Sequence, residues 1–255
     1  MQAYRKRTMS LPLHDRLKHL LPGYLYYPHK IAKEARGMEP ELRILREIVP
    51  AGRVAIDVGA NRGYYSYALS KIANRVEAFE PYPVVARFAR RKLGKNVRLH
   101  EVALSNYSGS AKLRIPQCKG DIDIHYSATL KDIPIEKYIE LTVPVMTIDQ
   151  FGFGDVGFIK IDAEGSDMDV IEGARETIGR CRPNLLVELL PLYKDPLFCI
   201  EQIETTLNYA ARIMVGDRLL DARQALQRFS PSVRTFNVVF MPSPEAAAPQ
   251  PHPAG

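Results

Sequence analysis

The sequence has few cysteines and no long apolar run, and each shortage excludes a class of protein. Its three cysteines, Cys118, Cys181 and Cys199, lie far apart without a Cys-x-x-Cys pair, which argues against a disulfide framework and a structural zinc site. No apolar stretch reaches the ~18 residues that a membrane-spanning helix needs. The basic N-terminus is not followed by an unbroken apolar segment, so no secretory signal is predicted and we expect a cytoplasmic protein.

Two common phosphate-binding motifs are also missing. In the segment Asp57-Val-Gly-Ala-Asn-Arg-Gly63, Asn61 stands where the second glycine of a dinucleotide-binding fingerprint would be, and no Gly-Lys-Ser/Thr follows. Nicotinamide-dependent oxidoreductases and P-loop proteins are therefore disfavoured. An acidic residue two positions before Gly59 suits a ligand that carries an amino group or another cation better than a pyrophosphate.

Positive charge is concentrated at the N-terminus. The net charge is +6, and residues 1–50 hold 10 lysines and arginines against 5 acidic residues. The sequence thus predicts a basic N-terminal extension, residues 1–50, which is irregular up to residue 38 and includes a covering helix from Pro40 to Ile48. Such an extension could touch an anionic partner, including the surface of a membrane.

From residue 51 the chain alternates short apolar runs with helical segments. Strands are expected at 54–58, 76–80, 97–102, 157–162, 185–189 and 236–240, with helices between most of them. This alternation predicts an α/β domain over residues 51–241 with a mostly parallel, doubly wound sheet. Residues 105–150 break the rhythm and predict a strand-rich insertion between strands three and four, and the Pro/Ala-rich residues 242–255 predict a disordered tail.

Carboxylates stand where the predicted strands end, and ligands of such sheets bind at those ends. Glu80 ends the second strand one βαβ step after Asp57, where a carboxylate can accept both hydroxyls of a ribose. Asp162, Glu164 and Asp167 follow the fourth strand. Helix capping explains Asp167, together with Ser166, but leaves Asp162 and Glu164 to a function. Glu188 lies inside an apolar run, where a carboxylate is costly unless it is paired, protonated or open to a cleft.

The order of these motifs resembles the FkbM-type methyltransferase family. The resemblance rests on five segments, Asp57 to Tyr64, Ala78 to Pro81, Val102 to Ser105, Ile159 to Gly165 and Ile171 to Ala174. It implies a Rossmann-like class I fold that binds S-adenosyl-L-methionine and methylates a hydroxyl of a sugar, glycan or secondary metabolite. The cofactor-binding residues that it implies are Asp57, Gly59, Asn61, Gly63, Glu80, Pro81, Glu101 and Ala103.

Methyl transfer to an alcohol requires that the hydroxyl lose its proton, and a partly desolvated carboxylate is a suitable base. Asp162 is the first candidate and Glu164 the second. His125 and Tyr126, in the polar loop 119–133, could contact the substrate. Asp162 and Glu188 could hold Mg²⁺ only with a third ligand, and none is evident, so no metal site is predicted.

Two other functions remain open. An RNA methyltransferase would explain the basic composition, but the chain lacks the Asn/Asp-Pro-Pro-Tyr/Phe motif that is common in base methylation. The acidic turn at 162–167 would also repel phosphates, so no nucleic-acid partner is expected. A non-catalytic Rossmann-like scaffold is disfavoured because the candidate cofactor residues are all present.

Overall fold

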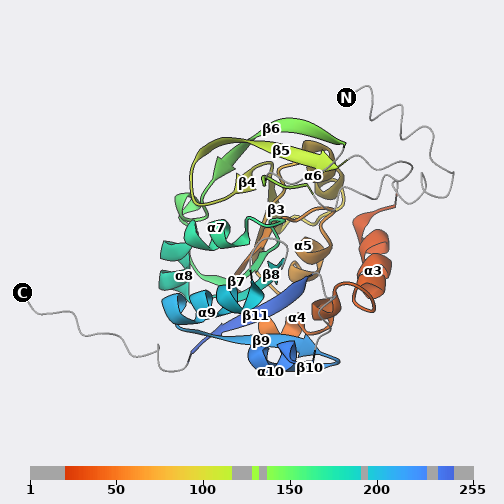
Figure 1. The fold of residues 1–255 in the computed structure, drawn as a ribbon. Coiled ribbons are helices and arrows are strands. Elements are labelled where there is room, and N and C mark those ends of the chain that lie inside the picture. The colour runs from red at the N-terminus through yellow and green to blue at the C-terminus, as the bar shows by residue number, and fades with distance from the viewer. Residues whose placement is uncertain (1–20, 117–127, 132–136, 191–194, 229–234, 244–255) are drawn as a thin grey trace, which may run out of the picture.

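The structure is a computed structural model of the 255-residue chain, and it describes residues 21–116, 128–131, 137–190, 195–228 and 235–243. An eight-stranded sheet forms the centre, helices cover both of its faces, and a three-stranded sheet lies at one end (Figure 1). The predicted α/β fold with a mostly parallel, doubly wound sheet is confirmed.

The large sheet has the strand order β10-β9-β11-β8-β7-β1-β2-β3. Strands β3, β2, β1, β7 and β8 run parallel, whereas the pairs β8/β11, β11/β9 and β9/β10 are antiparallel. The chain proceeds outward from β1 to β3 and then returns to lay β7 against β1, so the order reverses between β1 and β7. Such a reversal opens the crevice in which α/β sheets bind ligands. The strand bounds are β1 Val54–Val58, β2 Arg75–Phe79, β3 Val97–His100, β7 Val156–Ile161, β8 Asn184–Leu189, β9 Tyr209–Val215, β10 Arg218–Asp221 and β11 Phe236–Pro242.

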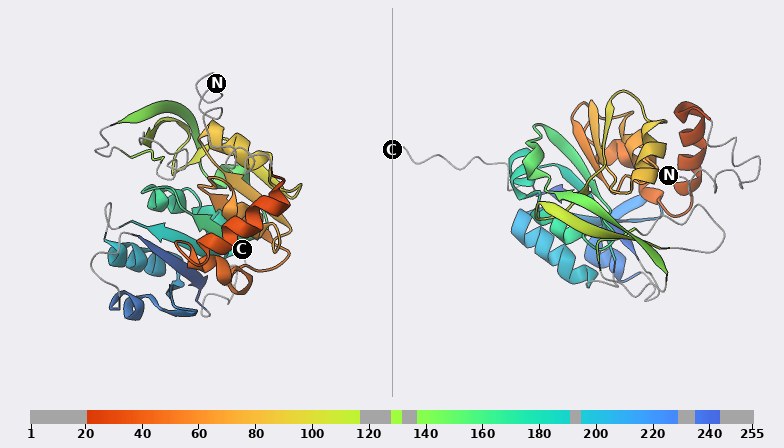
Figure 2. Two further views of the ribbon diagram at one scale, coloured as in Figure 1. Left: turned by 90° about the vertical axis from the view of Figure 1, so that its right-hand side faces the viewer. Right: turned by 90° about the horizontal axis from the view of Figure 1, so that it is seen from above.

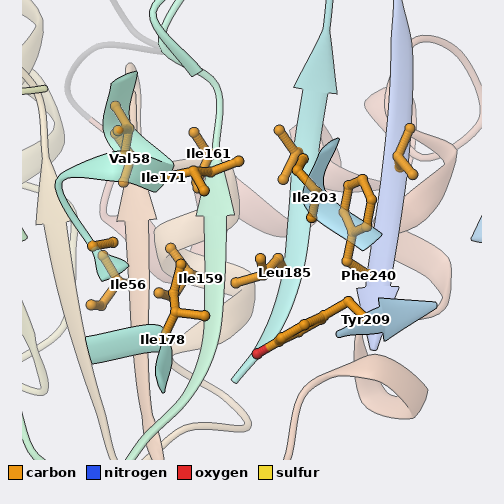
Figure 3. Close-up of a cluster of buried hydrophobic side chains, with 14 of the residues drawn as sticks. Ile56, Val58, Ile159, Ile161, Ile171, Ile178, Leu185, Ile203, Tyr209 and Phe240 are labelled. Carbon is orange, nitrogen blue, oxygen red and sulfur yellow. The ribbon is translucent and has the colours of Figure 1, made fainter. Parts of the chain in front are cut away.

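Successive side chains along the buried strands enter two separate cores. Ile159 and Ile161 pack toward the helices α7 (Asp167–Glu172), α8 (Arg175–Cys181) and α9 (Pro196–Leu207), and Figure 3 shows part of this cluster. Phe158 packs toward the opposite face, with α4 (Leu45–Ile48) and α5 (Tyr64–Leu69). Lys160 has the same parity as Phe158, so it belongs to the α5 face.

The predicted strand-rich insertion is the second sheet. Its strands β4 (Ala103–Leu104), β5 (Gly109–Pro116) and β6 (Tyr138–Met146) are ordered β4-β6-β5, with β5 and β6 antiparallel. Residues 128–131 lie against it through an antiparallel bridge between Arg114 and Thr129. His125 and Tyr126 lie outside the described residues.

The N-terminal segment differs from the prediction because part of the stretch expected to be irregular is helical. Helix α3 (Gly23–Glu34) contains Pro28 and lies along the outside of α5 (Figures 1 and 2). Tyr27 is fully buried there, and its hydroxyl donates to the carbonyl of Arg62 at 2.9 Å. Tertiary packing therefore overrides the helix-breaking tendency of proline. The expected covering helix divides into η1 (Pro40–Arg43) and α4.

Three further differences concern the second half of the chain. The helix expected after residue 166 is divided into α7 and α8 at Gly173, where a Cβ would lie 2.1 Å from the carbonyl oxygen of Ser105. A helix is expected from Leu197 to Ala210, but α9 ends at Leu207, and residues 209–226 form β9, β10 and α10 (Ala222–Leu226). The last strand includes Pro242, while residues 244–255 of the expected tail lie outside the described residues.

The remaining helices are α6 (Pro83–Arg90), after β2, and the short η2 (Asp149–Phe151), before β7. In the described parts of the chain, no helix has both the length and the apolar character needed to cross a membrane.

Candidate functional site

The turn after β1 brings the backbone of β1 against the end of β7. Gly59 has a φ of +72°, and a Cβ there would lie 1.8 Å from the carbonyl oxygen of Asp162. Only glycine fits this conformation and this close approach. Asn61, with a φ of 48°, then turns its backbone N–H toward the end of β2. The ends of β1 and β7, the two strands at the switch point, thus approach each other backbone to backbone.

Glu80 lies directly beyond β2, 6% exposed, and connects two turns. Its Oε2 accepts a hydrogen bond from the backbone N–H of Asn61 at 2.9 Å, and its Oε1 accepts one from Tyr82 at 2.8 Å. Burial raises the pKa of Glu80 to about 7, although both hydrogen bonds act in the opposite direction. Each carboxylate oxygen keeps a second lone pair, so Glu80 can also accept hydrogen bonds from a ligand.

A pocket of about 610 Å³ opens at these strand ends. Seven of the residues predicted from the sequence line it, namely Gly59, Asn61, Glu80, Pro81, Ala103, Asp162 and Glu164. The apolar part of the wall also includes Val58, Phe79, Val102, Leu104, Leu113, Ala128, Leu130 and Ala163. The pocket therefore combines an apolar surface with carboxylates from separate strand ends.

Three of the predicted residues do not line this pocket. Asp57 is fully buried behind the turn, where its Oδ2 accepts from the Ser66 hydroxyl at 2.5 Å. Among the described residues, its Oδ1 has no hydrogen-bond partner. Gly63 directly precedes α5 and faces the Tyr27 hydroxyl. Glu101 pairs with Arg90, its Oε1 lying 2.5 Å from the guanidinium, so the structure does not bring its side chain to the pocket.

Asp162 is held between a cation and a protonated acid. Its Oδ2 lies 2.8 Å from Nζ of the buried Lys160. Burial acts to raise the pKa of Asp162, but the charge of Lys160 and hydrogen bonds from Lys160 and Glu188 outweigh it and lower the pKa. Burial and the Asp162 carboxylate raise the pKa of Glu188 far above its usual range, so Glu188 holds the proton of this pair.

Glu164 lies in the turn after β7 in a left-handed conformation, with a φ of 47°. Burial, and then the charges of Asp162 and Asp167, raise the pKa of Glu164 to about 8. Asp167 shapes the turn by accepting hydrogen bonds from the backbone of Ala163 at 2.7 Å and Gly165 at 3.1 Å. Asp167 therefore holds the turn before α7, whereas the helix capping expected of Asp167 and Ser166 is not observed, because Ser166 makes no side-chain cap bond and Asp167 bonds to the turn.

The insertion is fastened to the same turn. The Thr129 hydroxyl donates to the carbonyl oxygen of Glu164 at 2.7 Å and accepts from the backbone N–H of Lys131 at 3.0 Å. The Lys131 side chain pairs with Asp169 of α7 at 2.7 Å. Through these bonds, residues 128–131 form one wall of the pocket beside Glu164.

Asp162 and Glu188 are neighbours, as their strand positions predict. Among the described residues, however, no group of three or more histidine, cysteine, aspartate or glutamate side chains is placed to hold a metal ion.

Several contributors to the site carry no local signal in the sequence. The apolar wall residues Leu113, Ala128 and Leu130 lie in the insertion, where nothing in the sequence indicates which side chains face the pocket. Tyr65, which reads as part of the apolar stripe of α5, places its ring 4.7 Å from Nζ of Lys160. Its hydroxyl donates to Glu39 at 2.9 Å, and Glu39 precedes the predicted domain.

Comparison with known proteins identifies the family. The model of the methyltransferase FkbM domain matches residues 57–213, which is more than half of the chain. The 2-O-methyltransferase NoeI of Sinorhizobium fredii (strain NBRC 101917 / NGR234) is 24% identical over 196 residues, which cover 70% of this chain and 78% of that protein.

Solved structures that resemble this chain include two methyltransferase-fold proteins. The methyltransferase FkbM of Methylobacillus flagellatus KT has a TM-score of 0.47 and 17% identity, with 74% of this chain and 43% of that chain covered. A Streptococcus mutans protein solved in complex with SAH has a TM-score of 0.46 and 15% identity, with 80% and 96% covered. The present chain spans less than half of the Methylobacillus protein. On the domain match, this chain is a methyltransferase of the FkbM family.

Proposed function

We propose that the pocket binds S-adenosyl-L-methionine and that the enzyme methylates a hydroxyl of a sugar, a glycan or a secondary metabolite. The observation that carries the proposal is the buried Glu80, which lies beside the glycine turn of β1 at the switch point of the sheet and lines the pocket. A carboxylate in this place can accept both hydroxyls of a ribose.

The other walls of the pocket fit the rest of such a cofactor. Phe79, Val102 and Leu104 offer an apolar surface to a purine ring. Asp162, which keeps its charge, favours a cation over a phosphate, and Asp57, behind the turn, adds to the negative potential. When bound, S-adenosyl-L-methionine supplies an activated methyl group on a positively charged sulfur.

The proton of the acceptor hydroxyl would pass to a carboxylate of the chain. Asp162 remains a candidate, but its lowered pKa and its pairing with Lys160 make it a weak base. Glu164 lines the same pocket and has a pKa of about 8, near the pH at which a general base works best. We therefore assign the base to Glu164 and an electrostatic and orienting role to Asp162.

Two observations support a small hydroxyl-bearing acceptor rather than a nucleic acid. The relative from Sinorhizobium fredii is named a 2-O-methyltransferase, which transfers methyl groups to oxygen. The turn beside the pocket also carries Asp162 and Asp167, which are charged at neutral pH and would repel a phosphate backbone.

The test is incubation of the full chain with methyl-labelled S-adenosyl-L-methionine and separate panels of glycans, lipid-linked sugars, polyketides and RNA. We expect alkali-stable label in a hydroxyl-bearing small molecule or glycan, and release of S-adenosylhomocysteine in equal amount. Labelling of RNA alone would overturn the acceptor class. Failure of the protein to bind the cofactor in calorimetry would overturn the proposal as a whole.

A further inference from the structure

The α5 face of the sheet contains a row of polar side chains that the sequence does not show as a group. Asp57 of β1 pairs in register with Lys160 of β7, and Glu188 of β8 pairs in register with Asn237 of β11. Asp162 follows β7 and bonds to both Lys160 and Glu188. These five residues form a polar row across four neighbouring strands, next to the pocket. Asp57 and Lys160 are buried, and the other three are half-buried.

At the β11 end, the polar row contacts the N-terminal segment that precedes β1, through Glu39 and Glu41. The Asn237 amide donates to Glu39 at 3.4 Å and to Glu41 at 3.2 Å. Glu39 also accepts the Tyr65 hydroxyl at 2.9 Å, and the Tyr65 ring lies under the ammonium of Lys160. Glu39 is thus connected to Asp162 through one aromatic ring and one lysine.

We propose that Glu39 and Tyr65 are positioning residues of the methyltransferase site, which fix the Lys160 ammonium against Asp162. Glu39 lies before the family-matched residues 57–213, so the N-terminal segment would complete a site that the matched domain does not contain by itself. The inference rests on the proposed function and names further residues of the same site.

The contacts from Glu39 to Tyr65, from Tyr65 to Lys160 and from Lys160 to Asp162 each restrict the position of a buried group. Lys160 is only 4% exposed, so its charge needs fixed partners. The groups that face it are Asp162, Asp57 and Glu39, together with the Tyr65 ring. A tyrosine that is fully packed but untethered could still shift by fractions of an ångström. The hydrogen bond to Glu39 holds the Tyr65 hydroxyl, and a misplacement of about 1 Å at a reacting group can cost about 100-fold in rate.

The charged neighbours of Glu39 include Lys160, Asp162, Glu34 and Glu41. Because the tether is a hydrogen bond, it requires an acceptor at position 39 but not a charge. Glu39→Gln keeps an acceptor, whereas Glu39→Ala removes it and Tyr65→Phe removes the donor. These three variants separate tethering from simple electrostatics.

The experiment is a double-mutant cycle on full-length protein, with kcat and cofactor affinity measured for each variant. We expect Glu39→Ala and Tyr65→Phe each to lower kcat about 10-fold, with the dissociation constant for S-adenosyl-L-methionine unchanged. The double variant should be no slower than either single variant, because both remove the same contact. Glu39→Gln should stay within about twofold of the wild type.

Matched controls test whether the effect is general destabilisation. Tyr67→Phe alters a tyrosine on the same helix whose ring stacks on Tyr27, and Glu41→Gln alters the other partner of Asn237. Both should leave kcat unchanged. Additive effects in the cycle, or an equal loss of kcat in the controls, would overturn the inference.

A second measurement does not depend on knowing the acceptor. The carboxyl ¹³C titration of Asp162 reports how firmly Lys160 is held, because looser pairing raises the pKa of Asp162 toward its ordinary value. Tyr65→Phe should raise that pKa, and Tyr67→Phe should not. An unchanged titration in Tyr65→Phe would refute positioning even if the wild type transfers methyl groups. A raised pKa in a protein that methylates none of the acceptors would support positioning and contradict only the proposed function.

Discussion

Single carboxyl groups around the pocket differ sharply in how they hold a proton. Burial raises the pKa of Glu80 to about 7 and that of Glu164 to about 8. Lys160 and Glu188 lower that of Asp162, although burial acts against them. Separated pKa values of this kind allow neighbouring carboxyl groups to take different roles.

Glu80 is predicted to bind the ribose of the cofactor. Glu80→Ala should weaken binding of S-adenosyl-L-methionine by about 1.5–3 kcal/mol, the loss expected for hydrogen bonds to a charged group. Calorimetry measures the change. Glu101→Ala is the matched control, because Glu101 pairs with Arg90 and does not line the pocket. Equal affinity of the Glu80 variant and the wild type would remove Glu80 from this role.

Glu164 is predicted to be the general base. Glu164→Gln should lower kcat about 10²–10⁴-fold and leave cofactor affinity nearly intact. A carboxyl group acts as a base only after losing its proton, so wild-type kcat/KM should rise with pH through about 8, the pKa of the free enzyme. Rate measurements from pH 6 to pH 9.5 test both points.

Asp162→Asn provides the comparison. This variant removes the partner of Lys160, so it should also lower kcat. The rise of kcat/KM should persist but move below pH 8, because the charge of Asp162 helps to raise the pKa of Glu164. If the rise disappears in Asp162→Asn and persists in Glu164→Gln, Asp162 is the base.

Among the elements, the junction of α7 and α8 determines where the small sheet lies. Its contact with the segment after β4 is backbone against backbone, since Gly173 leaves no room for a side chain beside Ser105. Strand β4 contributes Ala103 and Leu104 to the pocket wall. A change at the helix junction should therefore reach the cofactor site.

Gly173→Ala should destabilise the protein by about 1–3 kcal/mol, the usual cost of overpacking, and should weaken cofactor binding by displacing β4. Gly179→Ala is the matched control within α8, where a Cβ would meet nothing within 4 Å. That change should stabilise the helix by about 0.5–1 kcal/mol. Urea unfolding distinguishes the two, and similar effects of both variants would contradict the role given to the junction.

For the whole molecule, raised carboxyl pKa values make stability fall as pH rises. A carboxyl group with a raised folded pKa stabilises the fold below its unfolded value of 4.5, and this contribution is lost as pH rises through about 7 for Glu80 and about 8 for Glu164. At 1.36 kcal/mol per pKa unit, the Glu80 contribution is roughly 3 kcal/mol. The lowered pKa of Asp162 has the opposite effect, because it makes stability rise with pH. This rise is complete near the ordinary aspartate pKa of 3.8, so it does not affect the range above pH 5.

We therefore expect Tm, measured by circular dichroism without cofactor, to decrease steadily from pH 5 to pH 9. Glu80→Gln should flatten this decrease because an amide does not titrate. A Tm that rises across this range, or a Glu80→Gln profile parallel to the wild type, would contradict the assigned environment of Glu80.

Local sequence patterns were sufficient for much of the fold. The apolar runs at 54–58 and 185–189 are typical of strands in the interior of a parallel sheet, where helices cover both faces and both sets of side chains are buried. The predicted insertion after the third strand is likewise present as the second sheet. Helix α3 and the break at Gly173 could not be predicted, because the cause of each is a contact distant in the chain, Tyr27 with Arg62 and Gly173 with Ser105.

The site divides in the same way. The sequence by itself determined which carboxylates follow the strands, and hence that Glu80, Asp162 and Glu164 would meet at one edge of the sheet. Only the tertiary structure decided that Glu101 pairs with Arg90, that Glu188 holds a proton for Asp162, and that Glu39 reaches the polar row through Tyr65. Strand positions follow from local periodicity, whereas desolvation and electrostatic coupling depend on which distant segments the folded chain packs together.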